Sequence, residues 1–201
     1  LLLALTGCNR PSDVQESKEL PPIYPDYTDI TIPCNIAPLN FLLRNEPQSV
    51  EVSVKGPNTE FVVYGNSKIQ FPEKTWRTML ETEKGNSITV KVIAKVNGHW
   101  ISYSSFKWKV STDKIDPYLS YRRIEPGYEV WNKIQLCQRN LENFTEEVLA
   151  DNNLTDGSCM NCHIYNQNQK NTSLFHLRGK EGGTVLNRNG KLRKLNTKGK
   201  N

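Results

Sequence analysis

Alternation of apolar and polar residues is the feature that most constrains the fold of this 201-residue chain. Between residues 30 and 110, branched aliphatic and aromatic residues recur at every second position in several short runs. The clearest runs contain Val50, Val52 and Val54, then Ile88, Val90 and Val92, and then Phe106, Trp108 and Val110. Successive side chains of a β-strand point to opposite faces, so this period predicts strands with one buried face.

Turn residues and one helical segment complete the prediction for residues 30–112. Asn97-Gly98 separates two of the runs, and this pair tolerates the positive φ angles of a type I′ hairpin turn. One short helix is expected after Pro72, with an apolar face formed by Trp76, Met79 and Leu80. Several strands within about 80 residues predict an all-β sandwich of the immunoglobulin or fibronectin type III kind.

Looser strand patterns continue from residue 113 to the end of the chain. They cover residues 118–124, 133–139, 147–150, 173–177, 184–187 and 193–197. Asn189-Gly190 predicts a hairpin turn between the last two segments. Short strands joined by polar turns are typical of β-propeller blades, and a ring needs several blades. Residues 113–201 are therefore expected to be the first blades of an incomplete β-propeller.

Residues 159–163 spell C-x-x-C-H, the attachment pattern of a c-type haem. In such an attachment loop, Cys159 and Cys162 form thioethers with the haem vinyl groups, and His163 binds the iron as the proximal ligand. His176 is the candidate distal ligand, since it follows a polar loop that could fold over the haem. The pattern thus predicts haem c as the cofactor.

Two other interpretations of these cysteines stay open. A zinc site would use Cys159, Cys162 and His176, although no second close pair of ligands completes a tetrahedron. A disulfide would join Cys159 to Cys162, or either of them to another cysteine, as is common in exported proteins.

The N-terminal residues predict export and lipid attachment. Residues 1–7 are mainly apolar and run into Leu5-Thr6-Gly7-Cys8, which resembles the lipobox of bacterial lipoproteins. We therefore expect a signal-peptide remnant followed by a lipid on Cys8, which anchors the chain to a membrane of the cell envelope. The anchored chain would lie on the outer membrane, at its periplasmic or surface face. In that compartment Cys34 and Cys137 form a candidate disulfide, or remain buried free thiols.

Residues 9–29 are expected to form a flexible tether. They contain four prolines among Ser, Gln and Glu, a composition that resists packing into a core. The predicted organisation is therefore a leader, lipobox and tether over residues 1–29, a β-sandwich over 30–112, and the start of a propeller over 113–201.

Basic residues are concentrated near the C-terminus. The chain has a net charge of +5, and residues 178–201 contain eight Lys or Arg against one acid, Glu181. Nucleic acid is not expected as a partner, because an exported lipoprotein seldom meets it. Solvated hairpin faces account for these charges, with contact to anionic lipid or polysaccharide as the functional alternative.

Six short stretches carry a family resemblance. They are residues 24–29 (YPDYTD), 35–41 (NIAPLNF), 121–128 (YRRIEPGY), 138–141 (QRNL), 159–163 (CMNCH) and 175–179 (FHLRG). Together they resemble a group of exported TolB-like β-propeller lipoproteins of Gram-negative anaerobes, often labelled cytochrome c biosynthesis proteins. The resemblance spans most of the chain beyond residue 23. It implies a sandwich followed by a propeller, with the cysteine motif in the first blade.

Two functions of different classes follow as hypotheses. In the first, the chain is a membrane-anchored haem protein for electron transfer or haem-protein assembly, with a redox or envelope protein as partner. In the second, it carries no haem and is a surface or periplasmic scaffold that binds a glycan, a peptide or a partner protein. Candidate contacts, or alternatively core residues, are then Trp100, Trp108 and Trp131. An enzyme is the least supported class, because no Ser-His-Asp arrangement, phosphate loop or HExxH motif stands out.

Overall fold

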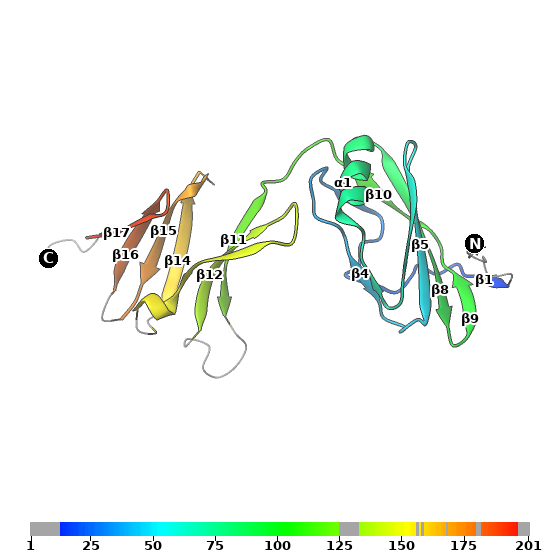
Figure 1. The fold of residues 1–201 in the computed structure, drawn as a ribbon, viewed down its shortest axis with the longest axis horizontal. Helices are drawn as coiled ribbons and strands as arrows, with labels where there is room; N and C mark the ends of the chain where they lie inside the picture. Colours follow the sequence, from blue (N-terminus) through cyan, green and yellow to red (C-terminus); the bar gives the residue numbers. More distant parts are fainter. Residues whose placement is uncertain are drawn as a thin grey trace, which may run out of the picture. The chain divides into compact units, whose positions relative to one another are not determined.

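The computed structural model describes residues 13–124, 133–155, 157, 159–167, 169–179 and 182–196. Over these residues the chain is all-β with one short helix, and its strands form several separate sheets, none of them closed (Figure 1). The chain divides into two compact units between Ile115 and Asp116, close to the predicted boundary after residue 112. No helix in the described part is long and apolar enough to cross a membrane.

The first unit contains two sheets. The seven-stranded sheet consists of β1 (Val14–Glu16), β3 (Ile30–Ile32), β5 (Ser49–Lys55), β6 (Glu60–Gly65), β8 (Ser87–Val96), β9 (His99–Ser102) and β10 (Phe106–Val110). The three-stranded sheet consists of β2 (Ile23–Tyr24), β4 (Phe41–Leu43) and β7 (Lys68–Ile69). The long strand β8 organises the larger sheet, because it pairs with β5 along one side and with β9 and β10 along the other.

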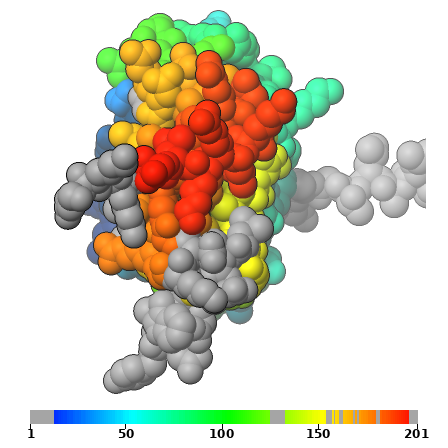
Figure 2. Space-filling model, turned by 90° about the vertical axis from the view of Figure 1, so that its left-hand side faces the viewer, coloured from blue at the N-terminus to red at the C-terminus, as the bar shows by residue number. Residues whose placement is uncertain are grey.

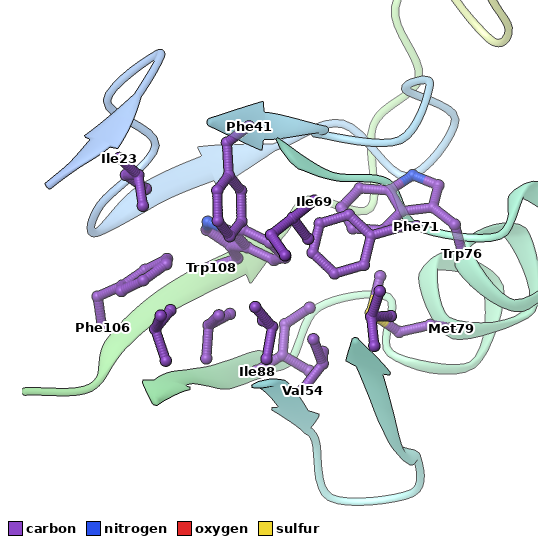
Figure 3. Close-up of a cluster of buried hydrophobic side chains, with 14 of the residues drawn as sticks. Ile23, Phe41, Val54, Ile69, Phe71, Trp76, Met79, Ile88, Phe106 and Trp108 are labelled. Carbon is purple, nitrogen blue, oxygen red and sulfur yellow. The ribbon is translucent and has the colours of Figure 1, made fainter. Parts of the chain in front are cut away.

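The predicted alternation of buried and solvent-facing residues in β5, β8 and β10 is confirmed. Every apolar residue of the three predicted runs is at most 2% exposed. These side chains share one core with Ile23, Phe41 and Ile69 of the smaller sheet (Figure 3). Burial of this continuous apolar layer removes it from water and is the main force that holds the two sheets together.

The helix and the hairpin turn of the first unit also match the prediction. Helix α1 (Glu73–Thr82) buries Trp76, Met79 and Leu80 on one face. Asn97 and Gly98 have φ angles of 50° and 85°, and they join β8 to β9 as the type I′ pattern requires.

The expected tether is corrected for residues 14–24. Val14–Glu16 forms β1 and pairs in parallel with β9, while Ile23–Tyr24 forms β2 and pairs with β4. Ile23 is 6% exposed and belongs to the core. Edge strands gain backbone hydrogen bonds even where few of their side chains are apolar, so a polar, proline-containing segment can still be ordered. Residues 1–12 lie outside the described residues.

The second unit also contains two sheets. The three-stranded sheet consists of β11 (Tyr118–Ile124), β12 (Ile134–Asn140) and β13 (Glu146–Asp151). The four-stranded sheet consists of β14 (Met160–Asn166), β15 (Gln169–Leu177), β16 (Gly183–Arg188) and β17 (Lys191–Leu195). The 3-10 turn η1 (Asn152–Thr155) lies between β13 and β14 in the chain. Six of these seven strands coincide with predicted segments, and Asn189-Gly190 forms the predicted turn between β16 and β17.

A small second core lies between these two sheets. Ile134, Leu136 and Ala150 of the three-stranded sheet pack in one cluster with residues of the four-stranded sheet, namely Met160, Phe175, Leu177 and Val185. One face of each sheet is therefore internal, and the other face is external within this unit.

Candidate functional site

The C-x-x-C-H motif lies on an edge strand and not in a loop. Cys159 immediately precedes β14, while Cys162 and His163 belong to it. β14 pairs only with β15 in the described part of the chain. The expected attachment loop is therefore corrected to an extended strand, which spaces successive residues farther apart than a compact turn would.

A β-bulge falls on the last two residues of the motif. Asn161 pairs with His176 and Ile164 pairs with Leu174, so Cys162 and His163 together lie opposite a single residue of β15. Such a bulge changes which face the following side chains point to. Of Cys162 the structure describes only the backbone.

His163 points into the interior of the second unit. Its imidazole makes an edge-to-face contact with Tyr165, with ring centroids 6.4 Å apart. Both residues line a cavity between the two sheets, together with Leu136, Ala150 and Phe175 among others. The cavity has a volume of only about 20 Å³, close to the space of one water molecule. A porphyrin does not fit where this imidazole points.

His176 lies on the opposite face of the same sheet. Its neighbour Phe175 points into the core, so alternation along β15 places His176 on the external face. There its Nδ1 lies 3.2 Å from the hydroxyl oxygen of Thr184. The structure therefore does not bring the predicted proximal and distal ligands, His163 and His176, to a common site.

Cys34 and Cys137, the candidate disulfide pair, are free cysteines in the structure, and each is buried in its own unit. The Cys34 thiol lies 3.5 Å from the carbonyl oxygens of Thr112 and Asp113. Burial raises the pKa of the Cys137 thiol, which favours the protonated form and lowers its reactivity. Cys34 belongs to the core cluster of the first unit, and Cys137 is fully buried in the second unit.

The remaining cysteine predictions are only partly covered by the structure. Cys159 is a half-buried free thiol packed against the second core. Cys8 lies outside the described residues. Within those residues, no group of three or more His, Cys, Asp or Glu side chains is arranged to hold a metal ion. The side chain of Cys162, one of the three ligands of the zinc interpretation, is outside the part of the chain that the structure describes.

The described part of the first unit contains a pocket that the sequence did not predict. It has a volume of about 370 Å³ and is lined by Tyr24, Leu42, Leu43, Arg44, Glu46 and Ser67. Pairing of β2 with β4 places Tyr24 opposite Leu42, and both side chains are exposed, at 52% and 43%. The guanidinium carbon of Arg44 lies 4.7 Å from the centre of the Tyr24 ring. This cation–π contact holds the charged group at the rim of an apolar surface.

Two carboxylates, those of Glu46 and Asp26, accompany Arg44 in this part of the first unit. Glu46 lines the pocket directly. Hydrogen bonds from the hydroxyl and the backbone N–H of Thr28 hold the pKa of Asp26 below its ordinary value, and the positive charge of Arg44 acts in the same direction. Within the described residues, Arg44 forms no ion pair, so its N–H groups can donate to a ligand.

A polar network on the external face of the three-stranded sheet also went unpredicted. The Arg123 guanidinium lies 2.5 Å from a Glu146 carboxylate oxygen, and the Tyr121 hydroxyl donates to the same carboxylate. The hydrogen bond to Glu146 is the main reason that the pKa of Tyr121 is raised. Tyr121 and Arg123 lie on β11 and Glu146 lies on β13, so these contacts reach across the central strand β12 and link the two outer strands of the sheet. We assign the network to stability.

No family model, curated protein or solved structure matches this chain. Its function is therefore inferred from the chemistry and geometry of its own residues.

Proposed function

We propose that this chain is a binding scaffold of the cell envelope, anchored through a lipid on Cys8, and that its first unit binds a saccharide. The observation that carries the proposal is the pocket at β2 and β4, where an exposed tyrosine, an aliphatic surface and the Arg44 guanidinium meet. Binding sites are concave, largely apolar and supplied with a few placed polar groups, and this pocket has each property.

A hydroxyl-rich ligand suits the polar groups of this pocket better than a simple anion or cation. Arg44 offers only hydrogen-bond donors, Glu46 offers acceptors, and the Ser67 hydroxyl can do either. Each sugar hydroxyl both donates and accepts, so a saccharide can satisfy all three residues at once. The apolar face of a sugar ring can rest on Leu42 and the exposed part of Tyr24.

The proposed architecture is an immunoglobulin-like sandwich followed by propeller blades. Supporting the first part, the two sheets of the first unit share one core. Supporting the second part, β14–β17 form a four-stranded antiparallel sheet in sequential order, which is the composition of one propeller blade. The three-stranded sheet packed against it would belong to a neighbouring blade.

Substitution of Arg44 by alanine is expected to weaken saccharide binding about 10-fold, since a charged donor is lost from the pocket. A glycan array supplies the oligosaccharide that binds best, and calorimetric titration then compares the dissociation constants. Leu42→Ser should give a smaller loss because it removes only apolar contact. Tyr64→Ala is the control, because Tyr64 is also exposed, at 59%, but lies on β6 outside the pocket. Equal losses for Arg44→Ala and Tyr64→Ala, or no glycan bound at all, would contradict the proposal.

The second candidate function is that of a protein with covalently attached haem, and only the C-x-x-C-H sequence motif favours it. His163 would first have to leave the cavity beside Tyr165, which requires β14 to rearrange. The scaffold proposal predicts that protein from a host with haem-attachment machinery is colourless and has the mass of the bare polypeptide. Colour that survives acid-acetone extraction and disappears in a Cys159→Ser, Cys162→Ser variant would instead establish the haem candidate.

A further inference from the structure

The external face of the four-stranded sheet carries three clustered cations. Phe175 and Val185 point into the core, so alternation places Leu186, Arg188, Lys191 and Arg193 on the other face. Arg188, Lys191 and Arg193 are all exposed. We call the face of the sheet that carries these three residues the basic face. The atoms of β16 and β17, coloured orange-red to red, lie at the surface in Figure 2.

The charges of the basic face are not neutralised within the sheet. Arg188 lies directly opposite Lys191 across the last hairpin, and Arg193 is two residues farther along β17. Like charges placed opposite one another destabilise a sheet. Residues 157–201 contain nine Lys or Arg and a single acid, Glu181. In the described part of the chain none of the three cations forms an ion pair. An external anion would remove this repulsion.

An apolar row crosses the same face beside the cations. Ile164, Leu174 and Leu186 are directly paired across β14, β15 and β16, and Arg193 continues the row on β17. Ile164 is 64% exposed, and the two leucines are half-buried. An exposed isoleucine at an edge, in a row that ends on Arg193, gives the face both apolar and basic character.

We propose that the basic face docks on the surface of an anionic lipid bilayer. Arg188, Lys191 and Arg193 would contact lipid phosphates, and Ile164 would enter the boundary between headgroups and acyl chains. A bilayer offers negative charge and apolar depth together, and surfaces that bind its interface combine basic with exposed apolar residues. A soluble polyanion would complement the three cations but leave Ile164 in water, which is why the lipid surface is favoured.

This surface belongs to the second unit and is independent of the saccharide pocket in the first. The test uses the full chain with Cys8→Ser, so that an attached lipid cannot produce the binding. Its partition onto vesicles of phosphatidylcholine mixed with phosphatidylglycerol is measured by co-sedimentation and compared with vesicles of phosphatidylcholine alone. We expect binding only to the anionic vesicles, with an affinity that falls as salt is added.

Combined substitution of Arg188, Lys191 and Arg193 by serine is expected to weaken this partition about 100-fold, since each cation near an anionic surface contributes separately. The matched control removes three exposed lysines of the first unit, Lys68, Lys107 and Lys109, and should change the partition less than about threefold. Equal loss in both variants, or equal binding to both vesicle types, would overturn the proposal. An unchanged thermal unfolding curve excludes misfolding as the cause.

Ile164→Ser separates a bilayer from a soluble polyanion. It should weaken binding to anionic vesicles several-fold and leave binding to dextran sulfate unchanged, because only the bilayer accepts an apolar side chain. An unchanged vesicle affinity in Ile164→Ser, or tighter binding to dextran sulfate than to vesicles, would assign the face to a soluble polyanion and overturn the lipid assignment.

Discussion

Replacement of Glu83 by alanine is expected to lower the free energy of unfolding of the first unit by about 3 kcal/mol. Glu83 follows helix α1 and is fully buried. Its carboxylate accepts hydrogen bonds from the Asn58 backbone N–H at 2.8 Å, the Thr59 hydroxyl at 2.9 Å and the Asn86 side-chain amide at 3.1 Å. Truncation leaves these donors without their acceptor. Urea unfolding followed by tryptophan fluorescence measures the change.

The control for this prediction is Glu81→Ala. Glu81 lies in the last turn of helix α1, its side chain is 70% exposed, and its ion pair with Lys84 at 2.7 Å lies at the surface. Exposed pairs of this kind contribute little, so the control should change the free energy of unfolding by less than about 0.5 kcal/mol. Similar losses in Glu81→Ala and Glu83→Ala would show that the buried hydrogen bonds are not the source of stability.

The stability supplied by Glu83 should depend on pH in a defined direction. Burial raises its pKa, but the hydrogen bonds from Asn58, Thr59 and Asn86 outweigh burial and hold the pKa below its ordinary value. A depressed pKa in the folded state means that the contribution is complete above the unfolded pKa, about 4.3, and is lost as pH falls through the folded value. Glu83→Gln should therefore unfold with a flatter pH dependence below about pH 4 than the parent chain.

The strands of the first core could be predicted because one physical signal controls them. β5, β8 and β10 each have one buried face, so burial imposes period two on their sequences. β14 has no such signal. Its bulge at Cys162 and His163 shifts the alternation, and Ile164 after it points outward. The cysteine motif could be recognised in the sequence, but the strand β14 that contains it could not be predicted.

The tether failed as a prediction for a related reason. Strand β1 joins the sheet through backbone groups, and its side chains are exposed or half-buried. A prediction from composition uses only the side chains. It therefore predicts disorder for a segment that is ordered mainly by backbone pairing with a strand distant in the sequence.

The pocket at β2 and β4 could not be predicted, because it depends on strand register. Tyr24 and Arg44 are far apart in the sequence, and only the pairing of Tyr24 with Leu42 brings the ring and the guanidinium together. A shift of this strand pairing by one residue would turn the ring and the guanidinium to the other face of the sheet and bring their neighbours to the pocket.

Replacement of Trp108 by alanine should have the largest effect on the stability of the first unit, about 4 kcal/mol. The indole is completely buried, and its ring centroid lies 5.5 to 5.8 Å from those of Phe71, Trp76 and Phe106. Its N–H also donates to the Tyr27 carbonyl at 2.7 Å, which fixes the segment before β3 against the core. Alanine would leave a cavity among three rings that cannot collapse without losing their own contacts.

Two further variants separate the packing of Trp108 from its hydrogen bond. Trp108→Phe keeps most of the ring but leaves the Tyr27 carbonyl without this donor, so we expect a loss of about 1 to 2 kcal/mol. Trp100→Ala is the matched control, because Trp100 on β9 is only half-buried, and it should cost less than about 1 kcal/mol. Of the two roles expected of the tryptophans, ligand contact or core residue, Trp108 has the second, because it is completely buried. Trp131 lies outside the described residues. A loss in Trp100→Ala as large as in Trp108→Ala would mean that stability does not follow burial in this core.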